Sequence, residues 1–385
     1  PSVMPDLTQT AVMQGIVKRD RNSGLGSTTF SNNLMRPSSH VGLHAQLLAY
    51  DITKSDGANV GANPIQTVPP RVGSSGAYPT RTYQYYAGHL EREGKPVTQL
   101  GRSVDNINAT AVEFGGLNIT PADVIKQPQK GLGGAMSILP IGATWVDDAR
   151  KVNATVTAPG QTTYRDFAMV WHKALNTRWA NGRPVEGIAA EGFGVPTDPQ
   201  DNSSMAINYK TEPLWYRFGL APDAPFGHAD GAGYGDMTNA HMAYSNALVG
   251  GDPQTPVLYA KPGQPLRTHI LMPSGGSRGT TFQLDGHVWS LNPFQAEKSD
   301  TGGYPMGTPG VGSVRFGYNP MSMYIGAHES ILPAAHFSFM IPSAGGSNAI
   351  PGDYLFRDYG AYGNTSGLWG LLRVTNEPEP APPAQ

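Results

Sequence analysis

The chain has 385 residues, 27 of them basic and 29 acidic, and its formal net charge of −2 provides no positive field for nucleic acid or an anionic membrane. Its 48 glycines and 34 prolines disfavour long helices and favour short strands joined by turns, while 39% hydrophobic residues suffice for a packed core. Cysteine is absent, which excludes disulfides, thiolate nucleophiles and cysteine-bound metals, and no apolar run is long enough to span a bilayer.

Short strands are predicted along the whole chain. In the first half, apolar and polar residues alternate over 41–47, and aromatic residues cluster over 82–86. A short helix is predicted over 121–125, because Thr120 can cap it and Pro121 suits its first turn. In the second half, aromatic and β-branched runs predict strands at 167–171, 257–259 and 280–289.

A weak internal repeat organises these segments. An aromatic strand, a loop, a Gly-Leu element and an apolar strand follow one another twice, in 83–136 and in 354–372. We therefore predict two β-sandwich domains, residues 1–150 and 151–375. The proline-rich tail, residues 376–385, is predicted to be extended and mobile, because proline disfavours both helix and sheet pairing.

Several segments together resemble the last two cupredoxin domains of multicopper oxidases, in particular the large bacterial copper or manganese oxidase branch. In the second half, the residues that carry the resemblance are 207–214, 251–256, 262–267, 282–289 and 367–374. In the first half they are 44–51, 56–61 and 127–132. The resemblance implies an all-β fold of tandem Greek-key cupredoxin-like β-sandwiches, with copper as the family's cofactor and an exported location, periplasmic or extracellular.

The family's copper ligands are largely replaced in this chain. A type 1 copper site needs a cysteine thiolate and two histidines, and the trinuclear cluster uses His-x-His pairs, none of which occurs here. The resemblance places other residue types at the ligand positions, namely Thr280, Gln283 and Asp285 for histidines, Arg357, Asp358 and Tyr359 for the His-Cys-His element, and Leu368 for the axial methionine.

Three residues stay as candidate metal ligands at or beside these positions: His44, Asp285 and His287. His287 matches a family position that usually does not bind copper, and the other two have alternative interpretations. Asp285 could instead form a buried ion pair with Arg357, since an unpaired buried charge is costly. His44 could be a hydrogen-bonded histidine near a domain interface. No catalytic or cofactor-binding residue is predicted, and a Ser-His-Asp hydrolase is disfavoured because no Gly-x-Ser-x-Gly element stands out.

The sequence therefore predicts a non-catalytic, multicopper-oxidase-like chain that serves as a structural or assembly partner. Its partner would be a copper-bearing cupredoxin chain or further copies of itself in a homo-oligomer, and no cofactor is expected in this chain. The alternative is part of an active oxidase acting on metal ions or phenolics, with copper held mainly by other domains or chains. A third hypothesis is a module that binds a small molecule between the sandwiches. No nucleic-acid partner is expected.

Overall fold

The computed structural model describes residues 16–18, 28–30, 38–73, 76–94, 96–124, 127–128, 131–148, 153–175, 204–218, 241–274, 279–291 and 322–380. Strands dominate this part of the chain, and its helices have four or five residues each: α1 (Leu214–Arg217), α2 (Asn246–Val249) and α3 (Ala361–Thr365). The predicted all-β fold is confirmed. None of these helices is long and apolar enough to cross a membrane.

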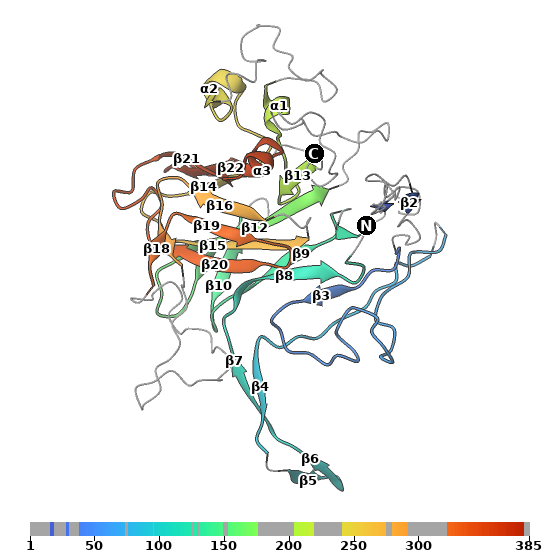
Figure 1. Ribbon diagram of the computed structural model, residues 1–385. Coiled ribbons are helices and arrows are strands. Elements are labelled where there is room, and N and C mark those ends of the chain that lie inside the picture. The colour runs from blue at the N-terminus through green and yellow to red at the C-terminus, as the bar shows by residue number, and fades with distance from the viewer. Residues whose placement is uncertain are drawn as a thin grey trace.

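Two sheets form a sandwich that is built mainly from the second half of the chain (Figure 1). The first sheet contains β10 (Thr144–Asp147), β11 (Asn153–Thr157), β12 (Tyr164–Leu175), β15 (Leu266–Ser274) and β20 (His336–Ile341), in that order, and β13 (Ser204–Ile207) pairs with β12. The second sheet contains β14 (Val257–Ala260), β22 (Trp369–Val374), β21 (Gly352–Asp358), β16 (Thr280–Leu284) and β19 (Ala327–Ile331), in that order. The predicted strands at 167–171 and 257–259 lie within β12 and β14.

An aromatic core fills the space between the two sheets. Phe282 on β16 is fully buried, and its ring centroid lies 5.9 Å from that of Trp171 on β12 and 5.6 Å from that of Phe339 on β20. On β12 the alternate residues Phe167 and Trp171 point into this core, because successive side chains of a strand face opposite sides. The other face of β12 is left for the first half of the chain.

The first half contributes a three-stranded sheet of β3 (Leu43–Ala45), β8 (Gly115–Pro121) and β9 (Gly134–Ile138). Its small core surrounds Leu117, which is fully buried. The predicted helix over 121–125 is wrong, since Pro121 is the last residue of β8 and pairs with Leu43. The predicted strand over 82–86 is also wrong, and only Tyr86 forms an isolated bridge, to Ala49.

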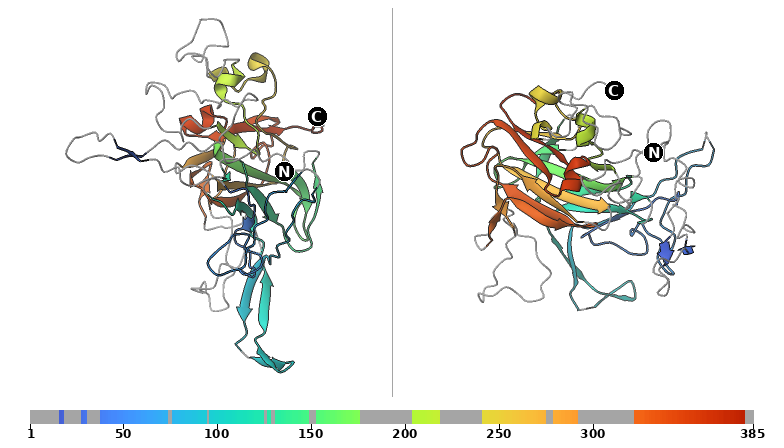
Figure 2. Two further views of the ribbon diagram at one scale, coloured as in Figure 1. Left: turned by 90° about the vertical axis from the view of Figure 1, so that its right-hand side faces the viewer. Right: turned by 45° about the horizontal axis from the view of Figure 1, so that its top comes forward.

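A long β-hairpin leaves the first half and projects away from the body of the molecule (Figures 1 and 2). We call residues 88–111 the arm. Its ladders are β4 (Gly88–Arg92) with β7 (Ile107–Ala111), and β5 (Val97–Gln99) with β6 (Arg102–Val104). Two further two-stranded ladders join β17 (Trp289–Ser290) to β18 (Tyr324–Ile325) and β1 (Ile16–Lys18) to β2 (Thr28–Phe30).

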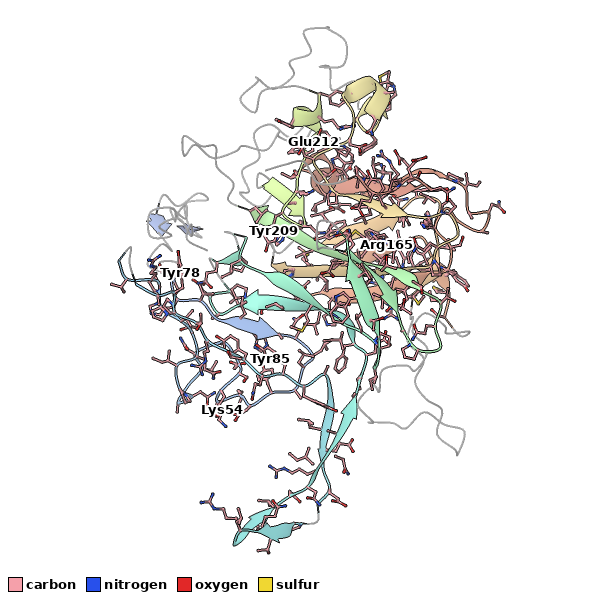
Figure 3. All side chains as sticks on the ribbon, turned by 180° about the vertical axis from the view of Figure 1, so that it is seen from behind. Lys54, Tyr78, Tyr85, Arg165, Tyr209 and Glu212 are labelled. Atoms are coloured by element: carbon pink, nitrogen blue, oxygen red, sulfur yellow. The ribbon has the colours of Figure 1, made fainter. Side chains whose placement is uncertain are left out.

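The predicted domain boundary at residue 150 falls between β10 and β11, which pair with each other. The six-stranded sheet therefore draws strands from both sides of that boundary, and the division into two domains stays a prediction. Arg165 lies near the same place, with its Nη2 atom 3.8 Å from Asp148 and 3.5 Å from Glu379, a residue of the predicted tail (Figure 3). The tail thus contacts the sheet at this point.

Candidate functional site

Asp358, which the sequence resemblance places at the position of the family's cysteine, is the last residue of β21. Its side chain is buried, and its Oδ1 atom accepts hydrogen bonds from the backbone N–H groups of Thr281 (2.9 Å) and Gly360 (3.1 Å). Leu368, which the resemblance places at the position of the axial methionine, is fully buried in the aromatic core. Side chains that stabilise the fold therefore hold both positions.

Gly363 lies directly against the Asp358 carboxylate. A Cβ atom added at Gly363 would overlap Oδ2 of Asp358, so only glycine allows this approach. The backbone N–H of Asp358 also donates to the carbonyl of Leu368 (2.8 Å), which closes the loop between β21 and β22. The backbone at Gly363 thus packs directly against the carboxylate.

The predicted ion pair between Asp285 and Arg357 is wrong. Arg357 stands opposite Gln283 in the ladder of β16 and β21, and its Nε donates to Gln283 Oε1 over 3.4 Å. Its guanidinium lies over the ring of Tyr359, 5.6 Å from the centroid. Asp285 comes two residues after Gln283, where β16 has ended and the chain turns at Gly286 with φ +70°. The cross-strand register therefore gives Arg357 an amide partner.

His287 has both ring nitrogens engaged by the backbone. Its Nδ1 atom lies 2.9 Å from the carbonyl oxygen of Asp285, which can only accept, so Nδ1 carries the proton. Its Nε2 atom accepts from the N–H of Gly345 over 3.0 Å. Burial lowers the pKa of His287, against the opposing effect of the hydrogen bond to Asp285. No lone pair of this neutral ring is left for a metal in this conformation.

His44 lies on β3 in a half-buried polar cluster of the first half. Its Nδ1 atom is 3.0 Å from Asp56 Oδ1, and the hydroxyl of Tyr50 donates to the same carboxylate oxygen over 3.0 Å. Burial, followed by the hydrogen bond to Asp56, raises the pKa of Tyr50 to about 12. Asp56 is positioned by the buried amide of Gln66, which accepts from its backbone N–H. The His44 side chain is 35% exposed, whereas His287 is buried.

The three predicted ligands do not come together. Within the described part of the chain, no three His, Asp or Glu side chains form a group that could hold a metal ion. His228, Asp230 and Asp236 offer imidazole and carboxylate ligands on one loop of the sequence, without the fixed spacing of a calcium-binding loop, and they lie outside the described residues. The residue types that the resemblance places at the copper-ligand positions, and the hydrogen bonds that they make, do not fit a copper centre.

A buried polar network joins the two halves of the molecule, and nothing in the sequence indicated it. His269 on β15 lies between Asp166 and Ser338, with its Nε2 atom 3.1 Å from Asp166 Oδ1 and its Nδ1 atom 2.6 Å from Ser338 Oγ. The backbone N–H of Gly116, from β8, approaches both Nδ1 and Oγ at 3.0 Å. We call Asp166, His269, Ser338 and Gly116 the seam network.

The seam network has the side chains of a serine hydrolase but no access for a substrate. His269 is fully buried and Ser338 is 5% exposed. Gly115 and Gly116 cover them so closely that a Cβ atom at either position would lie 2.6 Å from a side-chain atom of Ser338 or His269. Beside them, Arg267 forms a buried ion pair with Glu113, whose pKa is raised by burial and lowered in part by the arginine. This arrangement fastens the first half onto the sandwich.

A second buried histidine, His172, lies on β12, on the face that also carries Asp166. The ring of His172 packs on Tyr209, with 4.3 Å between centroids, and neither of its nitrogens has a hydrogen-bond partner among the described residues. Tyr209 belongs to a tight turn in which Asn208 and Tyr209 have φ of +52° and +60° (Figure 3). Burial lowers the pKa of His172 to about 4, so the ring is neutral at pH 7.

No family model matches the chain, and no curated protein matches it in sequence. Solved structures of low similarity include a blue copper oxidase from Nitrosomonas europaea, 11% identical, which matches over 87% of this chain and 69% of that chain with a TM-score of 0.40. A copper nitrite reductase from the same organism is 10% identical over 89% and 76% of the two chains, with a TM-score of 0.38. A multicopper oxidase is 12% identical over 88% and 71%, with a TM-score of 0.39.

Proposed function

We propose that this chain is a non-catalytic, multicopper-oxidase-like protein that acts as a structural or assembly partner. The observation that carries the proposal is Asp358, at the position of the family's copper-binding cysteine. Its carboxylate is buried and bonded to two backbone N–H groups, and Gly363 packs against it. A carboxylate held by these hydrogen bonds stabilises the loop after β21, and it cannot replace a thiolate as a copper ligand.

The surroundings of Asp358 support the same proposal. His287 uses both ring nitrogens in backbone hydrogen bonds, and Arg357 bonds to Gln283. Residues at or beside several of the family's ligand positions make these contacts. The fold as a whole therefore accommodates the side chains that replace the copper ligands. The partner would be a copper-bearing cupredoxin chain or another copy of this chain, in an exported assembly.

Copper content tests this function directly. The purified chain is incubated with excess Cu²⁺, desalted, and measured for bound copper, optical absorption and paramagnetic resonance. We expect substoichiometric copper without an assignable spectrum, and no oxidation of phenolic substrates. Asp358→Asn serves as a companion variant: it should melt at a lower temperature and leave the copper content unchanged. One equivalent of copper with a defined spectrum would overturn the proposal.

One observation favours the alternative function, in which the chain is part of an active oxidase. The Nδ1 atom of His44 is bonded to the carboxylate of Asp56, and metal-binding histidines are commonly held by such a carboxylate while the other nitrogen faces the ion. His44 could thus act as a single ligand in a site completed by another chain. If so, copper binding by the assembled protein should fall in His44→Gln and stay unchanged in His40→Gln, at an exposed histidine of the same region.

A further inference from the structure

We propose that the arm and the edge strand β10 form a self-association surface, on which the arm of one molecule lies against β10 of a second copy. The inference rests on the proposed function, because it names the partner of an assembly protein. It starts from two apolar surfaces that the described part of the chain leaves uncovered.

The first surface is the arm. A two-stranded hairpin is marginally stable alone in water, yet Figure 2 shows the arm standing clear of the sandwich in both views. Its apolar side chains are open to solvent: Leu90 is 46% exposed, Ile107 is 58% exposed, and Leu100 at the tip is fully exposed. None of these three side chains belongs to a hydrophobic core cluster of the described residues.

The second surface is β10, the last strand of the six-stranded sheet. Trp145 is 60% exposed and Val146 is 73% exposed. Consecutive residues point to opposite faces of a strand, so β10 is uncovered on both faces. Its hydrogen-bonding edge away from β11 also has no neighbouring strand among the described residues. Exposed apolar edge strands of this kind are templates for pairing with another chain.

A second copy is the occupant that the geometry favours. The arm spans residues 88–111, which is similar to the 20–30 residues that each partner contributes to a standard interface. Its exposed charges have both signs, with Glu91 beside Arg92 and Arg102 near the tip, so they select neither nucleic acid nor an anionic membrane. In one closed, two-fold arrangement, the arm of each copy would lie against β10 of the other, so that both surfaces of both copies are covered.

The oligomeric state of the full chain tests this inference. Sedimentation equilibrium should show a reversible dimer. The double variant Leu100→Asp/Ile107→Asp should raise the dimer dissociation constant about tenfold or more, since charges replace apolar contacts. The control is Val72→Asp, at a side chain that is 87% exposed and lies outside both surfaces; it should leave the constant unchanged. Circular dichroism confirms that each variant is folded. A chain that stays monomeric at every concentration tested would overturn the inference.

Cross-linking tests which surfaces meet. Because the chain has no cysteine, Leu90→Cys and Trp145→Cys can be introduced into two separately tagged copies and joined with a flexible bismaleimide. Mixed dimers should be captured by this pair and not by Val72→Cys with Trp145→Cys. Equal yields from both pairs would overturn the pairing of the arm with β10. A monomeric, copper-free chain would refute only this inference, whereas a copper-bearing dimer would refute only the proposed function.

Discussion

The sandwich and the seam between the halves are held together by different physical means. Between the two sheets, large apolar side chains meet around Phe282, and the contact depends mainly on buried area and shape. At the seam, His269, Ser338 and the backbone of Gly116 meet through hydrogen bonds at distances that leave no room for a Cβ atom. The first kind of contact tolerates exchange among apolar residues of similar size, while the second depends on particular atoms.

The largest effect is expected when the apolar contact is broken at its centre. Phe282→Ala removes a ring that contacts Trp171, Trp289 and Phe339. The free energy of unfolding should fall by about 3–5 kcal/mol, through lost burial and the cavity left behind. Chemical denaturation followed by tryptophan fluorescence measures this loss.

Val288→Ala is the control for the core, since Val288 lies near the same strand and its side chain is 57% exposed. Its effect should stay within about 0.5 kcal/mol. Similar losses in the two variants would mean that the aromatic core does not carry the stability of the sandwich.

A pH titration probes the buried face of β12, where His172 packs without a hydrogen-bond partner among the described residues. Because its pKa is about 4 in the folded chain and 6.5 in the reference state, the unfolded chain binds more protons between these values. The contribution of His172 to the free energy of unfolding is therefore fully present above pH 6.5. It falls by about 3 kcal/mol as the pH is lowered toward 4. His172→Leu should flatten that part of the curve, measured as unfolding free energy against pH.

The exposed His40 supplies the comparison for this titration. His40→Leu should keep the acid-dependent loss of the unaltered chain. If His172→Leu retained the same loss, the buried imidazole would not be its source.

The smallest effect is expected at the seam. In Gly116→Ala, the new Cβ atom would lie 2.6 Å from Cβ of His269, so β8 must shift away from the six-stranded sheet at a cost of about 1–3 kcal/mol. Hydrogen exchange should show faster exchange in β8, with protection unchanged in β21 and β22. Gly134→Ala, on the neighbouring β9, is the matched control, because the nearest atom would be 3.9 Å away. Unchanged protection in β8 would show that the seam adapts more freely than its distances indicate.

Strands of the sandwich could be predicted from the sequence because their signals are local. Aromatic and β-branched residues mark β12 and β14, and both strands are buried. Over 280–289 the pattern correctly indicated β16, which ends at Leu284, and wrongly continued the strand through the turn at Gly286 that leads to β17. The strand expected over 82–86 is absent, since only Tyr86 pairs through its backbone, with Ala49. The aromatic residues there serve side-chain contacts instead: Tyr83 donates to the carbonyl of Gln66, and Tyr85 donates to that of Leu43.

The seam network could not be predicted, because its residues are far apart along the chain. Asp166 and His269 are 103 residues apart, and His269 and Ser338 are 69 apart. No spacing rule relates such positions, and only the pairing of β12 with β15 and of β15 with β20 brings them together. The Asp285–Arg357 pair failed for a related reason. The sequence indicated two complementary charges, and the ladder register decided that Gln283 faces the arginine.

The pairing of β10 with β11 also has a practical consequence for dissecting the molecule. A shortened protein starting at residue 151 would lack Thr144–Asp147 and would uncover the edge of β11, inviting aggregation during expression. A start near residue 140 would keep that ladder intact. Anyone wishing to study the C-terminal portion by itself should therefore choose the earlier start.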